Sequence, residues 1–192
     1  MEIKVFSDMI NALEQVGKGI LSIKDLQVRK RQHYRKVIDE TYRLLDSAIL
    51  LVLNRLSNLL LIEKQEDFIR ELRGLDNFTE WTNIERQVRL CNNLHTTGRE
   101  MEDLYNKLID RISLRNPGEF QNLTWALLYE GEAGLANFIS KSLKNLSEMA
   151  DTAAQSSDDY EKVRKAVRKT RNALRKERLN LISSEIKFIN QI

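Results

Sequence analysis

Apolar residues recur at intervals of three and four along much of the chain, the spacing that places them on one face of an α-helix. This pattern predicts an amphipathic first helix over residues 3–26, where the apolar positions are Ile3, Phe6, Ile10, Leu13, Val16, Ile20 and Ile23. Gly17 and Gly19 are poor helix formers, so we expect this helix to break or bend between Gly17 and Ser22.

Capping and turn signals divide the rest of the chain into further helices. Gly74 can end a short helix, and Asn77 and Glu80 have the spacing of a capping box that begins the next one. Asn116 followed by Pro117 is typical of another helix start. We therefore predict helices over residues 27–63, 65–73, 78–114, 117–151 and 158–190.

The scarcity of turn residues sets the fold class. The 192 residues include seven glycines and one proline, and no useful stretch alternates between apolar and polar as a strand does. We predict an all-α fold, an antiparallel bundle of four to five long helices in a single domain. Residues 92–98 are poor helix formers, which leaves open whether helix 78–114 kinks there or stops and restarts.

The most apolar stretch, residues 44–62, has the length of a membrane-spanning helix. Asp46 and Arg55 lie inside it, and an ionised side chain is costly in hydrocarbon. We therefore interpret this stretch as a central helix that is buried among the others.

Basic residues are concentrated near the C-terminal end. Residues 163–178 carry eight basic side chains and one acidic one, although the net charge of the whole chain is only +3. On a helical projection the lysines point towards solvent, whereas the arginines form one stripe beside a narrow apolar arc. This Arg stripe consists of Arg164, Arg168, Arg171, Arg175 and Arg178.

Sorted in this way, the arginines suit the margin of a packed seam, because the guanidinium group is weakly hydrated and binds carboxylates through two hydrogen bonds. We expect the Arg stripe to pair with carboxylates of the same molecule. A nucleic-acid interface is the weaker alternative, because the overall charge is low and only Tyr160 and Phe188 flank the stripe. Candidate acidic partners in the middle of the chain are Glu80, Glu85, Glu100, Glu102 and Asp103.

A membrane role is the main alternative to internal pairing. The candidate membrane-contacting residues are Phe6, Ile10, Leu13 and Ile20 on the amphipathic N-terminal helix, acting with the basic C-terminal helix on an anionic membrane surface. In architecture alone, such a bundle resembles the executioner bundles of cell-death systems, and that resemblance implies an attack on membranes.

No arrangement of catalytic residues stands out. Cys91 and His95 are one helical turn apart and could supply two metal ligands or a thiol–imidazole pair, but a structural zinc site needs four ligands, and His33 is the only other histidine. We therefore expect no enzyme activity, no metal and no cofactor. The single cysteine excludes an internal disulfide and favours a reducing, cytoplasmic location.

The sequence thus favours a non-enzymatic, intracellular helical bundle that acts by helix packing, either against a protein partner or against a second copy of itself. The alternatives are a membrane-active bundle and, behind it, a nucleic-acid binder that uses the basic C-terminal helix.

Overall fold

Helices make up all the regular structure in the part of the chain that the computed structural model describes, which is residues 4–22, 27–77, 96, 99–100, 103, 106 and 132–190. The predicted helix over residues 78–114 and the first part of that over 117–151 lie outside these ranges. The elements are α1 (Lys4–Ser22), α2 (Val28–Leu61), α3 (Gln65–Arg73), α6 (Glu132–Ser147), α7 (Ala150–Ala153) and α8 (Ser157–Asn190).

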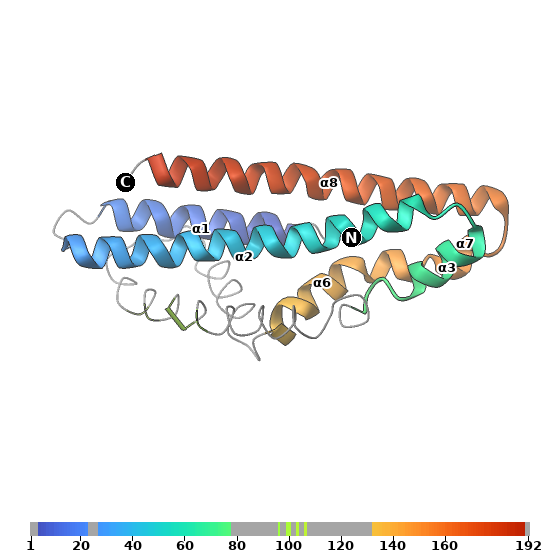
Figure 1. The fold of residues 1–192 in the computed structure, drawn as a ribbon, viewed down its shortest axis with the longest axis horizontal. Coiled ribbons are helices and arrows are strands. Elements are labelled where there is room, and N and C mark those ends of the chain that lie inside the picture. Colours follow the sequence, from blue (N-terminus) through green and yellow to red (C-terminus); the bar gives the residue numbers. More distant parts are fainter. Residues whose placement is uncertain are drawn as a thin grey trace.

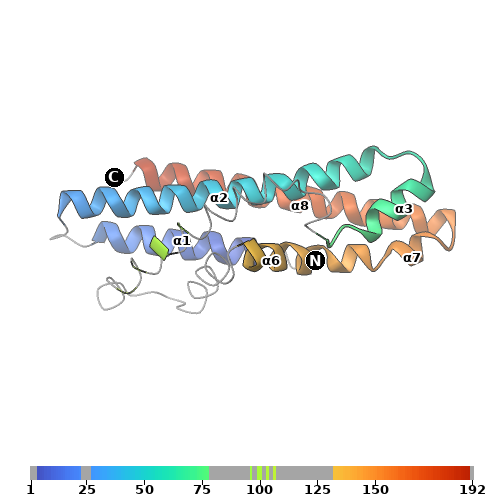
Figure 2. The same ribbon diagram turned by 60° about the horizontal axis from the view of Figure 1, so that its bottom comes forward.

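Two helices of 34 residues, α2 and α8, form the long axis of the molecule. They run antiparallel and side by side, each about 50 Å long at 1.5 Å per residue (Figure 1). α1 packs against both of them beside the first half of α2, whereas α3, α6 and α7 lie towards the other end, where α6 and α7 contact α3 and α8 (Figure 2). The predicted all-α antiparallel bundle is confirmed.

α2 has the central position that was predicted for the apolar run. It contacts α1, α3 and α8, and its buried side chains follow helical spacing from Tyr34 to Leu59. By length and composition alone α2 could also cross a membrane, and 44% of its most apolar window is buried inside the bundle. Core helices of soluble proteins have the same properties, and in this fold the apolar run packs against α1, α3 and α8.

One described boundary differs from the predicted one. The helix that was predicted to end at residue 151 ends at Ser147 and is followed by the short α7, whereas residues 23–26 of the first predicted helix lie outside the described residues. Ser156 caps α8, since its hydroxyl accepts a hydrogen bond from the backbone N–H of Asp159 at 3.1 Å.

The break or bend expected between Gly17 and Ser22 does not occur at the two glycines, because α1 continues through both of them to Ser22. Gly17 is buried against α8, and a Cβ atom at this position would lie 2.7 Å from Cδ2 and 2.9 Å from Cε2 of Phe188. The absence of a side chain thus lets α1 approach the aromatic ring closely, which outweighs the poor helix propensity of glycine.

Tyr42 of α2 completes this junction of three helices. Its ring is 1% exposed, with its centroid 6.3 Å from that of Phe188, and its hydroxyl shares a 2.7 Å hydrogen bond with Ser184 of α8. Burial raises the pKa of Tyr42 to about 12, so its phenol stays protonated in the folded protein at neutral pH.

Candidate functional site

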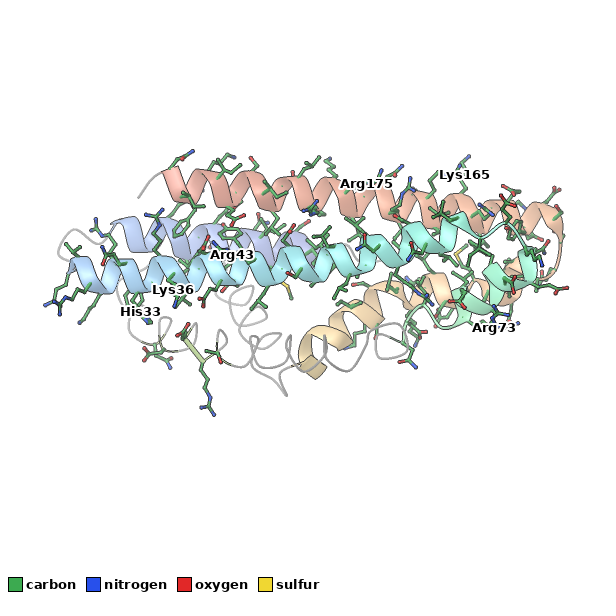
Figure 3. The ribbon with its side chains drawn as sticks, viewed as in Figure 1. His33, Lys36, Arg43, Arg73, Lys165 and Arg175 are labelled. Atoms are coloured by element: carbon green, nitrogen blue, oxygen red, sulfur yellow. The ribbon has the colours of Figure 1, made fainter. Side chains whose placement is uncertain are left out.

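The Arg stripe lies along α8, but its five members have different surroundings. Arg164, Arg171 and Arg178 are half-buried, whereas Arg168 and Arg175 are exposed. In the described part of the chain, neither exposed arginine has an ion-pair partner. Figure 3 shows Arg175 and the nearby Lys165 projecting outward from α8.

Arg164 binds the end of α2. Its Nη2 donates to the carbonyl oxygen of Leu60 at 2.8 Å, and its Nη1 donates to that of Ile62 at 2.9 Å and to the Tyr160 hydroxyl at 2.6 Å. The guanidinium carbon lies 5.5 Å from the ring centroids of both Phe68 and Tyr160. Because the last carbonyls of a helix lack partners within it, Arg164 acts as a C-terminal cap supplied by another helix.

Arg178 forms the ion pair that was expected for the stripe, but with a different acid. Its Nε donates to Oδ1 of Asp46 at 2.7 Å, and its Nη2 donates to Oδ2 at 3.2 Å. This two-point hydrogen bond raises the pKa of Arg178. Asp46 belongs to α2, so the carboxylate partner comes from the central helix and not from the acidic middle of the chain.

Arg171 has a mixed environment. Its Nη2 donates to the side-chain oxygen of Asn172 at 3.2 Å, and its Nε is buried without a hydrogen-bond partner among the described residues. The predicted partners Glu80, Glu85 and Glu102 lie outside the described residues. No ion pair between the stripe and Glu100 is seen among the described residues, so pairing with the acidic middle of the chain stays a prediction.

A groove runs between α2 and α8 next to Arg175 and Arg178. Its volume is about 320 Å³. Leu50 and Leu53 line it from α2, and Leu53 is 7% exposed. None of its described lining residues is a carboxylate. The α2–α8 groove is lined by Leu50, Leu53, Asn54, Ser57, Arg175, Arg178 and Leu179.

Three large apolar side chains on α2 and α8 are exposed, and one of them, Leu179, lines the groove. Leu179 is 68% exposed, Ile186 lies seven residues further along α8 and is 52% exposed, and Leu61 is 77% exposed. On a helix, positions seven apart share a face, and Leu61 follows Leu50 and Ser57 along one face of α2.

Three of the four predicted membrane-contacting residues lie in the core of the bundle. Phe6 is 1%, Ile10 5% and Leu13 0% exposed, and the side chain of Ile20 lies outside the described residues. For these residues to contact lipid, α1 would have to leave α2 and α8. Membrane contact by α1 stays a prediction that this fold does not display.

Acidic groups gather on the opposite end of the α2–α8 contact from Arg164. Burial raises the pKa of Glu185, and the charge of Asp39 and a hydrogen bond with it act in the same direction. Arg43 lowers the pKa but is shared with Asp39, which it binds at 2.8 Å. The ionised form of the Glu185 carboxyl group is therefore destabilised in the folded protein.

The raised pKa of Glu185 predicts that the stability of the fold depends on pH. Because the folded pKa of Glu185 is raised above its ordinary value of 4.5, its stabilising contribution is complete below that pH and is lost as the pH rises through the folded pKa. We expect Glu185→Gln to raise the melting temperature by about 1–2 °C at pH 7 and to have no such effect at pH 4. Glu161→Gln, an exposed control on α8, should leave the melting temperature unchanged at both pH values. An equal gain in melting temperature from Glu185→Gln at pH 7 and pH 4 would contradict a raised pKa of Glu185.

Metal and nucleophile candidates gain no support from the described residues. His33 is exposed on α2, where its ring contacts that of Tyr34, while Cys91 and His95 lie outside the described ranges. Within those ranges, no group of three or more His, Cys, Asp or Glu side chains is placed to hold a metal ion.

In comparisons with known proteins, no protein family model, no curated protein and no solved structure matches the chain.

Proposed function

We propose that the protein is a non-enzymatic helical-bundle interaction module whose α2–α8 groove binds an amphipathic helix of a partner protein. The observation that supports this most is the 68% exposure of Leu179 at the edge of a groove of about 320 Å³. An apolar helix face laid into such a groove would bury Leu179 and Leu61, and helix-in-groove recognition uses this kind of surface.

The charge around the groove indicates the chemistry of the partner. Arg168 and Arg175 are exposed, and three lysines lie further round α8. Arg178 is already neutralised by Asp46. The partner helix should therefore carry Asp and Glu beside its apolar face, because such residues complement the unpaired cations. A second copy that used the same face would bring like charges together. The exposed lysines are Lys165, Lys169 and Lys176.

The hydrogen bonds of the Arg stripe also favour binding through its exposed members. Arg164 and Arg178 use their hydrogen bonds to hold helices of the same molecule together. The exposed Arg168 and Arg175 therefore remain available for a partner. The single cysteine fits the proposed cytoplasmic location.

Replacing the exposed leucines tests this proposal. We expect Leu61→Ser with Leu179→Ser to leave the free energy of unfolding within about 0.5 kcal/mol of the wild type, because neither side chain belongs to the core. The same double variant should bind the partner at least tenfold more weakly, because truncating an interface anchor typically costs about 1–2 kcal/mol of binding free energy. Quantitative mass spectrometry of proteins captured from the cells that make this chain measures the loss.

Val28→Ser is the matched control, because Val28 is 72% exposed but lies at the far end of α2. It should retain the protein partner of the α2–α8 groove. Capture of the same proteins by the Leu61/Leu179 variant and by the wild type would exclude the α2–α8 groove as the binding surface.

A further inference from the structure

A second surface, separate from the α2–α8 groove, lies where α2 begins. Gln27, Val28, Arg29 and Lys30 are all exposed, and consecutive positions at a helix start point to all sides, so none of the described helices surrounds this turn. In both views the start of α2 extends beyond the ends of α1 and α8 (Figures 1 and 2). Among the described helices, α2 therefore protrudes furthest at this end.

This end of the molecule is strongly basic. Residues 28–36 contain five arginines and lysines and no acid. Among the described residues, Arg29 and Lys30 have no ion-pair partner. Lys36 is 74% exposed, and its 3.7 Å pair with Glu40 is of the exposed kind that contributes little. Lys187, on the last turn of α8, adds a cation near the same end. Figure 3 shows Lys36 and His33 on this first part of α2.

The basic tip, defined as Arg29, Lys30, Arg31, Arg35 and Lys36, has an apolar side chain at its front. Val28 is 72% exposed and lies one residue before the first cation. A cluster of cations with an exposed apolar residue at its leading edge matches the chemistry of an anionic bilayer, whose headgroups attract the charges while its interface accepts the apolar group.

We infer that the basic tip docks the bundle end-on onto an anionic lipid surface. Nucleic acid suits the tip less well, because Tyr34 is 4% exposed and His33 is the only exposed ring of residues 28–36 available for stacking on bases. This surface also needs no rearrangement of the bundle, in contrast to the buried face of α1. The inference is independent of the partner helix proposed for the α2–α8 groove.

Vesicle co-sedimentation of the full chain tests the inference. Vesicles of phosphatidylcholine with phosphatidylserine should bind the protein, binding should weaken as salt increases, and vesicles of phosphatidylcholine alone should leave it in solution. Each basic residue near such a surface contributes about fivefold to partitioning. Arg29→Gln, Lys30→Gln and Lys36→Gln together should therefore lower binding to the anionic vesicles by about a hundredfold.

The matched control removes the same amount of charge from α8, with Lys165→Gln, Lys169→Gln and Lys176→Gln. It should keep most of the binding, because these exposed lysines lie away from the tip. Equal losses in the two triple variants would overturn the inference, since binding would then follow net charge alone. So would failure to bind anionic vesicles, or a tip-dependent affinity for duplex DNA that exceeds the affinity for the vesicles.

A fluorescent label tests the end-on orientation directly. Val28→Cys and Lys162→Cys, each combined with Cys91→Ser and labelled with an environment-sensitive dye, are compared on anionic vesicles. Dye at position 28 should shift to the blue on binding, and dye at position 162, at the other end of the molecule, should not. A shift at both positions, or at position 162 alone, would contradict end-on docking.

Discussion

We expect Gly17→Val to lower the free energy of unfolding by about 2 kcal/mol, the middle of the range for overpacking a well-packed core. The first atom of any side chain at this position would lie 2.7 Å from the ring of Phe188, well inside contact distance. Phe188 cannot simply move away, because it packs against Tyr42 and is only 6% exposed. Urea denaturation with an unchanged slope would report the loss.

Lys18→Val is the control, because it introduces the same β-branched side chain on the same helix at a position whose side chain is 71% exposed. It should cost no more than about 0.5 kcal/mol in helix propensity. The clash itself is isolated by adding Phe188→Ala to Gly17→Val. The double variant should lose less stability than the two single changes summed, and strict additivity would show that Gly17 is not required for the close approach.

We also expect Arg164→Ala to lower the free energy of unfolding by about 2 kcal/mol, because hydrogen bonds from a charged donor contribute about 1.5–3 kcal/mol and water can replace part of the loss here. The two carbonyl groups of Leu60 and Ile62 would lose their donors. Phe68 and Tyr160 would lose the cation that lies over their rings. Calorimetry or urea denaturation measures the change.

The guanidinium group is required for this contact, so Arg164→Lys should recover only a small part of the loss: an ammonium group cannot reach both carbonyls and the tyrosine with the same geometry. Arg168→Ala, one turn further along α8 and exposed, should cost less than about 0.5 kcal/mol. Hydrogen exchange should increase in α3, which the Arg164 contact holds beside α8. Full rescue by lysine, or an equal cost at Arg168, would mean that the hydrogen bonds to the carbonyls do not stabilise the fold.

Periodicity was sufficient to predict the all-α fold and the long helices α2 and α8, because apolar residues recur at helical spacing on the face that each of them buries. It also placed the arginines of α8 beside the apolar arc. It could not identify their partners, since a helical projection shows which way a side chain points and not which helix lies there. Asp46 is an example: it interrupts an apolar run, and it does so because Arg178 lies opposite.

Two features depend on contacts that have no signal in local sequence. The donors of Arg164 bind backbone carbonyls, which every residue has, so no residue type in the sequence could reveal this cap. Gly17 was interpreted through its low helix propensity, whereas its role comes from a ring 171 positions further along the chain. The exposure of Leu61 and Leu179 was likewise hidden, because an apolar residue in a helical pattern is normally assigned to the core.

If a partner helix occupies the α2–α8 groove, as we propose, photo-crosslinking in the cells that make the protein should capture it. A photoreactive amino acid is placed at position 179, with position 162 as an exposed control on the same helix. We expect position 179, and not position 162, to crosslink to one other protein, through a segment with apolar residues at helical spacing flanked by Asp and Glu. Crosslinks from position 179 only to a second copy of this chain, or none beyond those from position 162, would contradict the claim.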